Sequence, residues 1–333
     1  MLLPILMGAA VNLCRLFRPC LSIGLGWLCA ALAFAQDTPH TATSQSHPSK
    51  SGCPPTPLPL EQQRAYVEQA PAKNAGFLWR IEKDNRTSWL YGTMHLASID
   101  HAKPGNQVMQ GMRRSDVLAV ELNPYEWQAG SPAPVANAYA WSEALLDRLA
   151  KALAQECIKV ERAHLPLVGT LPLLASQGQR LGLRWGYSPD ARLSQIAKRT
   201  SKPIVALETL EQQRNALAPK SQAEFETSVE SSLASFESGA MQTELGQISR
   251  AWQTSDWQAM SQVEQEMIAL QPAFATRILS ERNLLMADKL DALHASGQRV
   301  FAAVGVLHMA GETGLPKLMR GKGYSVTYTP FTP

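Results

Sequence analysis

The sequence has little that would hold it in a membrane or against a nucleic acid. The longest apolar stretch near a terminus, residues 21–31, falls short of the roughly 20 residues that a membrane-spanning helix needs, and no later segment comes closer. Positive charge is not in excess, since 31 Lys and Arg residues stand against 28 Asp and Glu residues. This balance gives no electrostatic reason to expect nucleic acid or an acidic membrane surface as a partner.

The first 35 residues have the three parts of a secretory signal peptide. Arg15 and Arg18 form a basic region, residues 21–31 are apolar, and Ala33 and Ala35 precede Gln36 as in a cleavage site of the A-x-A type. Removal of residues 1–35 takes away two arginines and no acidic residue, which lowers the formal net charge from +3 to +1. We therefore expect an exported protein, periplasmic or secreted, with no stable membrane insertion after signal cleavage.

Cysteine is scarce, and most of it lies in the predicted signal peptide. Cys14, Cys20 and Cys29 would leave with that signal, so that only Cys53 and Cys157 remain. In an oxidising compartment these two thiols would pair and attach the mature N-terminal segment to the domain. The alternative is two unpaired thiols, with Cys157 as a buried apolar side chain.

Residues 36–60 separate the signal from the domain. They are rich in Pro, Ser and Thr and contain few large apolar side chains. Such a segment cannot bury enough surface to offset its loss of conformational entropy, which predicts a disordered tether and discounts His40 and His47 as ligands. Residues 61–333 are long enough to form one domain with a substantial core.

Within this domain, apolar runs rich in β-branched and aromatic residues alternate with segments of helical periodicity. We predict strands at residues 77–83, 87–92, 116–121, 203–207, 299–304 and 324–329. We predict helices at residues 104–115, 141–156, 190–200, 222–237, 240–253, 257–270 and 273–296. The first two strands resemble a hairpin. The pattern predicts an α/β fold: a central mixed β-sheet from two pseudo-related halves, flanked by helices, with a large helical insertion over about 130–270.

Two segments far apart in the chain have the same design. Residues 89–97 and 302–310 each form an apolar, strand-like run that reaches a glycine, Gly92 or Gly305, and places a histidine, His95 or His308, three residues later. A glycine at a strand end permits a sharp turn or the close approach of a ligand, and a histidine beyond it is suited to bind metal or move protons. The pair indicates one site built by two halves of the chain.

Two acidic residues repeat the same relation. Glu121 closes the strand at 116–121, and Glu208 closes the strand at 203–207. In open α/β sheets, ligands bind beyond the carboxyl ends of the strands, so these acids and the two histidines converge if the strands are parallel neighbours. Two histidines and two carboxylates could hold a divalent ion such as manganese, cobalt or zinc, and the ion would activate water for hydrolysis of an amide or ester.

Each of these residues also has a purely structural interpretation. One Gly-x-x-His sequence arises by chance in many chains, and a strand-terminal Glu often pairs with an arginine or caps a helix. Glu208 could be an acidic residue at the start of the next helix. Among the other histidines, His101 could lie behind His95, whereas His164 and His294 have the pattern of surface or helix residues.

An arginine and an aspartate outside the strands complete the candidates. On a helix, Arg282 would share a face with Leu279, Leu285 and Met286. A permanent charge in that position needs a carboxylate partner, or it serves an oxyanion during turnover; a surface salt bridge is the alternative. Asp190 is most simply the N-cap of the helix that follows it, with a site role as the second possibility.

At these residues the sequence resembles the TraB/GumN family, which includes the Tiki proteins and belongs with the erythromycin esterase and ChaN-like proteins. The resemblance covers about residues 77–328 and nearly the whole domain. It is carried by residues 92–95, the strand that ends in Glu121, and residues 202–209, 281–287, 304–309, 314–316 and 323–326. Relatives often have Gly-Ile-Asp where this chain has Tyr-Ser-Pro-Asp at 187–190, which leaves a site role for Asp190 open.

The resemblance implies an α/β fold with two related halves, whose paired Gly-x-x-His motifs and an acidic residue face one cleft. Members of the Tiki branch are described as metal-dependent proteases that use manganese or cobalt, and TraB-like members are linked to shutting down a peptide pheromone. By position, His95 and His308 match the motif histidines, Glu121 matches the family's acid, and Glu208 and Arg282 match other recurrent positions.

Together these features predict an exported metal-dependent hydrolase, above all a peptidase that acts on a peptide or protein. The expected catalytic residues are His95, Glu121, Arg282 and His308, and the expected ligands of the ion are His95, Glu121, Glu208 and His308. A protein that sequesters a peptide, metal or haem without turnover is the alternative. An esterase in which a histidine activates water without metal is a third possibility.

Overall fold

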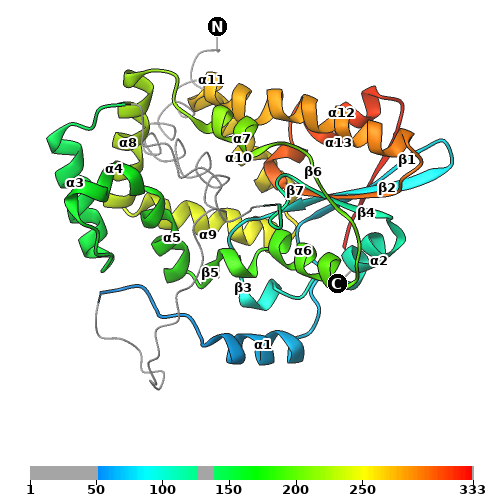
Figure 1. The fold of residues 1–333 in the computed structure, drawn as a ribbon, viewed down its shortest axis with the longest axis horizontal. Coiled ribbons are helices and arrows are strands. Elements are labelled where there is room, and N and C mark those ends of the chain that lie inside the picture. The colour runs from blue at the N-terminus through cyan, green and yellow to red at the C-terminus, as the bar shows by residue number, and fades with distance from the viewer. Residues whose placement is uncertain (1–51, 127–138, 332–333) are drawn as a thin grey trace, which may run out of the picture.

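A mixed β-sheet forms the centre of the molecule, and helices cover both of its faces (Figure 1). In this computed structural model, residues 52–126 and 139–331 are described. The predicted signal peptide and residues 36–51 of the predicted tether lie outside the described residues. No helix among the described residues is both long and apolar enough to cross a membrane.

Six strands form the central sheet in the order β6-β4-β7-β2-β1-β8. Their bounds are β1 (Phe77–Lys83), β2 (Arg86–Thr93), β4 (Val117–Val120), β6 (Ile204–Ala206), β7 (Val300–Gly305) and β8 (Ser325–Thr329). All six predicted strands are confirmed to within one residue at each end. They were recognisable because the central strands are continuous apolar runs; β4 and most of β7 are buried.

The direction of the strands places the predicted site residues at one edge of the sheet. Strands β6, β4, β7 and β2 run parallel to one another, whereas β1 runs antiparallel to both β2 and β8. The two strands that carry the twin motifs, β2 and β7, lie side by side, with Thr93 opposite Gly305. The carboxyl ends of four strands therefore meet at the same edge.

The antiparallel β1–β2 pair is the predicted hairpin. Lys83 pairs with Arg86, and the two residues between them, Asp84 and Asn85, have φ values of 52° and 58°. A two-residue turn with positive φ at both positions twists in the same sense as the strands, and Asp and Asn tolerate that conformation better than most residues.

Helices account for most of the remaining chain. The longer ones are α1 (Leu60–Gln69), α2 (Asn106–Arg114), α3 (Glu143–Gln155), α5 (Leu171–Arg180), α6 (Pro189–Arg199), α7 (Leu210–Leu217), α8 (Gln222–Glu237), α9 (Ala240–Gln253), α10 (Trp257–Leu270), α12 (Arg282–Ala295) and α13 (Leu315–Gly321). The short ones are α4 (Leu165–Val168) and α11 (Pro272–Ala275). In Figure 1, α12 and α13 lie on one side of the sheet and α2 and α6 lie on the other.

The predicted helical insertion forms a lobe beside the sheet. Helices α3, α4, α5, α8 and α9 gather there, at the left of Figure 1. A minor two-stranded sheet, β3 (Ala97–Ser98) with β5 (Leu183–Arg184), was not predicted. Trp252 of α9 fixes the lobe to the sheet, because its buried indole N–H donates to the Gly92 carbonyl at 2.9 Å.

The helix predicted for residues 273–296 is not one regular helix. Residues Thr276–Glu281 form a π-helical segment between α11 and α12. A π-helical turn contains an extra residue, which shifts the side chains that follow to a different face. The expected face was partly wrong: Leu279 and Met286 are buried with Arg282, but Leu285 is 50% exposed.

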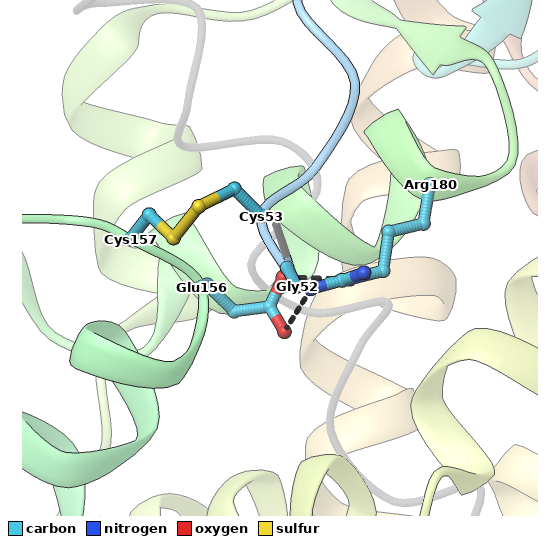
Figure 2. Close-up of a disulfide and its surroundings, with 5 residues drawn as sticks. All are labelled: Gly52, Cys53, Glu156, Cys157 and Arg180. Atoms are coloured by element: carbon cyan, nitrogen blue, oxygen red, sulfur yellow. Dashed lines mark hydrogen bonds and ion pairs between the residues drawn. A yellow bond between two sulfur atoms is a disulfide. The ribbon is translucent and has the colours of Figure 1, made fainter. Parts of the chain in front are cut away.

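A covalent bond holds the N-terminal segment of the described chain. The predicted Cys53–Cys157 disulfide is present and joins residues 104 positions apart, with a Cα–Cα distance of 5.5 Å. Figure 2 shows Arg180 beside it, where the guanidinium pairs with Glu156 and donates to the Gly52 carbonyl. Arg184 donates to the Pro55 carbonyl at 2.9 Å. Residues 52–59, which were predicted to belong to the disordered tether, are thus bonded to α5 and β5. Leu60, also predicted there, begins α1.

Candidate functional site

The two motif histidines, Glu121, Glu208 and Arg282 meet at the carboxyl edge of the parallel strands. His95 follows β2, His308 follows β7, Glu121 follows β4 and Glu208 follows β6. Because β4 lies next to both β6 and β7, its terminal carboxylate occupies the centre of the group. The convergence expected from parallel neighbouring strands is therefore what the structure has.

His95 is oriented by a carboxylate from α6. Its Nδ1 lies 3.0 Å from Asp190 Oδ2, and the Thr93 hydroxyl donates to the other oxygen of Asp190 at 2.5 Å. The Trp185 ring stacks near the imidazole, with 6.3 Å between centroids. An anionic acceptor at Nδ1 favours the tautomer that carries its proton there, and His95 Nε2 is directed towards Glu121 Oε1 at 3.8 Å.

His308 is oriented in the same way by an amide. Its Nδ1 lies 2.6 Å from Asn283 Oδ1, and the Asn283 amide N–H donates to the Thr313 carbonyl at 2.9 Å, which fixes the direction of the amide. His308 Nε2 lies 3.9 Å from Glu121 Oε2. Burial and the neighbouring Arg282 charge lower the pKa of His308 to about 3, so that its imidazole is neutral at physiological pH.

Glu121 lies between the two imidazoles. Its Oε1 accepts the Gly305 N–H at 2.8 Å, and its Oε2 accepts Arg282 Nη2 at 2.6 Å. Burial opposes the charged carboxylate, but His308, the permanent charge of Arg282 and the Gly305 N–H together hold the pKa of Glu121 well below its ordinary value. Glu121 is thus an anion that is only 5% exposed.

Arg282 joins the two acidic residues. Its Nε and Nη2 donate to Glu208 at 2.9 and 2.5 Å, in addition to the bond from Nη2 to Glu121. Its Nη1 donates to the Ile278 carbonyl at 3.0 Å, within the π-helical segment. A buried arginine aimed at carboxylates, one of the arrangements expected from the sequence, is therefore present.

Glu208 faces Arg282 rather than the histidines. Besides the two bonds from Arg282, its Oε1 accepts the Gln213 side chain at 3.0 Å. Burial raises the pKa of Glu208, and the bonds from Arg282 act against that rise. Its backbone N–H donates to the Glu121 carbonyl at 3.1 Å, so the two strand ends are also joined through the main chain. The capping residue of the following helix is Thr209, not Glu208.

Gly305 leaves the space that this arrangement needs. A Cβ atom at that position would lie 3.1 Å from Glu121 Oε1 and 3.6 Å from His95 Nε2. The φ angle of Gly305 is −48°, which other residues adopt, so the reason for glycine here is close approach rather than backbone conformation. At this copy of the motif, the close approach that glycine permits is that of the Glu121 and His95 side chains.

The distances between the two Nε2 atoms and the Glu121 carboxylate decide whether one metal ion could bind these groups as they stand. Two ligands of one divalent ion lie roughly 3.0–3.4 Å apart, given metal–ligand distances of about 2.1 Å. The spacings of 3.8 and 3.9 Å between the Nε2 atoms and Glu121 exceed this range by roughly half an ångström. Among residues 52–126 and 139–331, no group of three or more His, Cys, Asp or Glu side chains is arranged to hold an ion as it stands.

The residue set nevertheless fits a divalent ion. Both imidazoles are anchored through Nδ1 and direct Nε2 to one carboxylate, which is the form in which His binds metal. The formal charges of Asp190, Glu121, Glu208 and Arg282 sum to −2, which a divalent ion would neutralise. Each carboxylate oxygen has two lone pairs, so the bonds from Arg282 and Gly305 do not exclude coordination by Glu121.

The structure corrects one expectation about nearby residues and adds detail to two others. Asp190 is not the N-cap of α6; Ser188 is, since its hydroxyl accepts the Ala191 N–H. His294 lies in α12, as the helix interpretation expected, and it is 1% exposed and bonds to Ser88 and the Lys83 carbonyl. His101 packs against Trp252 and bonds to Ser98.

Comparison with known proteins finds a match over the part of the chain that contains all of these site residues. Residues 77–328 match the TraB/PrgY/gumN family. A protein of Shigella flexneri and one of Escherichia coli (strain K12), both described as "Uncharacterized protein YbaP", are each 30% identical over 250 residues, which is 71% of this chain and 89% of the relative. No solved structure matches the chain.

Proposed function

Because the chain belongs to the TraB/PrgY/gumN family, and because its twin motifs direct two imidazoles at one carboxylate, we propose that it is a metal-dependent hydrolase that cleaves peptides or proteins. The observation that carries the proposal is the position of Glu121 between the Nε2 atoms of His95 and His308. Neither nitrogen is within hydrogen-bond distance of the carboxylate, and a contraction of roughly half an ångström would bring each nitrogen and the carboxylate to the spacing of ligands of one ion.

In the proposed site, His95 and His308 hold the ion through Nε2, and Glu121 is its carboxylate ligand. The ion is manganese, cobalt or zinc. When bound, it polarises the scissile carbonyl and lowers the pKa of a coordinated water. Arg282 keeps Glu121 ionised and in place and holds Glu208 beside it, where Glu208 would be the further carboxylate ligand. A carboxylate of the site that does not coordinate the ion would be the general base for the attacking water.

The proposed substrate class rests on the resemblance to the Tiki and TraB-like branches, in which peptides are cleaved or inactivated. The proposed compartment is outside the cytoplasm. The signal-like sequence at 1–35 supports it, and so does the Cys53–Cys157 disulfide, since structural disulfides persist in oxidising compartments. N-terminal sequencing of the exported protein tests this part: a mature terminus at Gln36 is the expected result.

Metal content tests the site itself. We expect purified protein, after removal of any tag, to retain about one equivalent of a divalent ion, and the His95→Ala and His308→Ala variants to lose it. His164→Ala is the matched control, because that imidazole is exposed and lies outside the site. Metal-stimulated cleavage of a peptide library should follow the same order. Wild-type protein without metal and without metal-stimulated cleavage would overturn the proposal.

Two outcomes would assign the site to another function. Stoichiometric binding of a peptide, haem or metal that survives Glu121→Gln, with no product by mass spectrometry, would make the protein a sequestering protein. Hydrolysis that persists after exhaustive chelation would make it an esterase or peptidase in which a histidine activates water directly.

A further inference from the structure

The two imidazoles of the site are held by chemically different partners. His95 Nδ1 faces the carboxylate of Asp190, whereas His308 Nδ1 faces the amide oxygen of Asn283. The Asp190 carboxylate comes from α6, which lies on the other side of the sheet from α12, the helix that carries Asn283. The similar sequences of the twin motifs give no sign of this difference, since neither partner belongs to either motif.

Asp190 is itself held in a defined orientation. Thr93, two residues before His95 on the same strand end, donates its hydroxyl to Asp190 Oδ1. The second oxygen, Oδ2, is thereby directed to His95 Nδ1. The start of α6 places the carboxylate within reach, because Ser188 caps the helix and leaves Asp190 in its first turn with its side chain pointing at His95. Thr93, Asp190 and His95 therefore form a chain of hydrogen bonds that ends at the site.

We propose that Asp190, held by Thr93, is the positioning residue of the site: it fixes His95 as the Nδ1–H tautomer, so that Nε2 is directed to the ion. The proposal deepens the proposed function and rests on it for the ion. A carboxylate behind a histidine ligand makes the imidazole a stronger donor and adds a negative charge near the cation. Asn283 orients His308 without adding charge, whereas Asp190 both orients His95 and adds a negative charge. The loss of Asp190 should therefore weaken metal binding more than the loss of orientation alone would.

The tautomer can be measured without metal. In protein labelled with ¹⁵N-histidine and kept metal-free at pH 8, long-range ¹H–¹⁵N correlation spectra distinguish Nδ1–H from Nε2–H for each imidazole, with His95→Ala used for assignment. We expect the Nδ1–H form for His95 in the wild type and a shift to a mixture dominated by Nε2–H in Asp190→Ala. Asp288→Asn, a change at a surface ion pair with Lys322, is the matched control and should leave the spectrum unchanged.

Calorimetric titration with Co²⁺ gives the second readout. Partners behind metal-binding histidines are typically worth about 10–100-fold in affinity, so Asp190→Asn, which keeps the shape and removes the charge, should weaken Co²⁺ binding by that factor. Thr93→Val should weaken it by a smaller factor, because Asp190 remains but loses one of its anchors. Asp288→Asn should bind as the wild type does.

The results separate this inference from the proposed function. If wild-type His95 is the Nε2–H tautomer, or if Asp190→Ala leaves its spectrum unchanged, the positioning role is wrong whatever the protein binds. If the wild type binds Co²⁺ and Asp190→Asn binds it equally well, the role in metal affinity is wrong and the metal site stands. A wild type that shows the expected tautomer but binds no divalent ion contradicts the proposed function and supports the positioning of His95.

Discussion

Arg282 allows two carboxylates to be buried side by side. Glu121 and Glu208 are 5% and 4% exposed, and without a cation between them their charges would repel in a poorly solvated environment. Arg282 bonds to both, and it also donates to the Ile278 carbonyl of the π-helical segment. The arginine is therefore a structural requirement for a site that keeps Glu121 ionised.

Arg282→Met tests this requirement. The change removes the charge and keeps much of the side-chain volume, so it leaves two buried carboxylates without their shared cation. Breaking a buried ion pair in this way typically costs about 3–5 kcal/mol, and we expect a loss of that size in the free energy of unfolding, measured by urea denaturation. Adding Glu208→Gln to Arg282→Met should recover part of the loss; a double variant as unstable as the single one would contradict this account.

Some residues of the site could be predicted from the sequence, and others could not. His95, His308 and Glu121 follow apolar strands, and Arg282 lies on an apolar helix face where a permanent charge is unfavourable. Each could therefore be recognised from the sequence as a candidate. Asp190 could not be paired with His95, because 95 residues separate them and nothing local marks the contact. The orientation of Glu208 towards Arg282 also depends on packing and could not be predicted.

At the scale of elements, burial decides what the sequence reveals. Strands β4 and β7 are buried and are continuous apolar runs, whereas β8 contains exposed residues; all six strands were predicted. Helix α1 has no buried residue and so offers no apolar periodicity. The minor sheet of β3 and β5 has two residues in each strand, too few for a pattern. The π-helical segment differs from an α-helix by its hydrogen bonding, which periodicity in a short segment does not show.

The packing of α9 against α10 brings two acidic residues together. Burial and, secondarily, the charge of Glu266 raise the pKa of Glu244 to about 8 from its ordinary value of 4.5. The Oε1 atom of Glu244 is buried without a hydrogen-bond partner among the described residues. The folded protein thus holds a proton here that the unfolded chain loses above pH 4.5, and stability from this group falls as pH rises towards 8.

Glu244→Gln should remove this pH dependence. We expect the variant to gain stability over the wild type at pH 8 and to differ much less at pH 5, as measured by the midpoint of thermal unfolding at each pH. Glu266→Gln should produce the same trend to a smaller extent, since it removes only the secondary cause. A stability difference between Glu244→Gln and wild type that does not change with pH would contradict the prediction.

At the scale of the whole molecule, the Cys53–Cys157 bond constrains the unfolded chain. It closes a loop with a sequence separation of 104 residues, and a loop of that size limits the entropy of the unfolded state. We expect the Cys53→Ser/Cys157→Ser variant to lose about 3–5 kcal/mol of unfolding free energy. Urea denaturation of the variant beside the oxidised and the reduced wild type checks this value.

The contacts of Arg180 provide a control for that measurement. Arg180→Lys removes the forked pairing with Glu156 while the disulfide stays in place, so it should cost far less than the loss of the covalent bond. Reduced wild type and the double serine variant should unfold at the same urea concentration. If the serine variant were as stable as the oxidised protein, the N-terminal attachment would have no thermodynamic role.

The Cys53–Cys157 disulfide also divides the residues of the candidate site into two groups, those inside the covalent ring that it closes and those outside that ring. His95 and Glu121 belong to the ring that the disulfide closes, while Glu208, Arg282 and His308 lie outside it. A protease that cuts once within the ring would leave both fragments tethered, so the damaged molecule would run as a single band on a gel without reductant. Cleaved protein could in this way retain every side chain of the candidate site, and only treatment with a thiol reductant would reveal the cleavage.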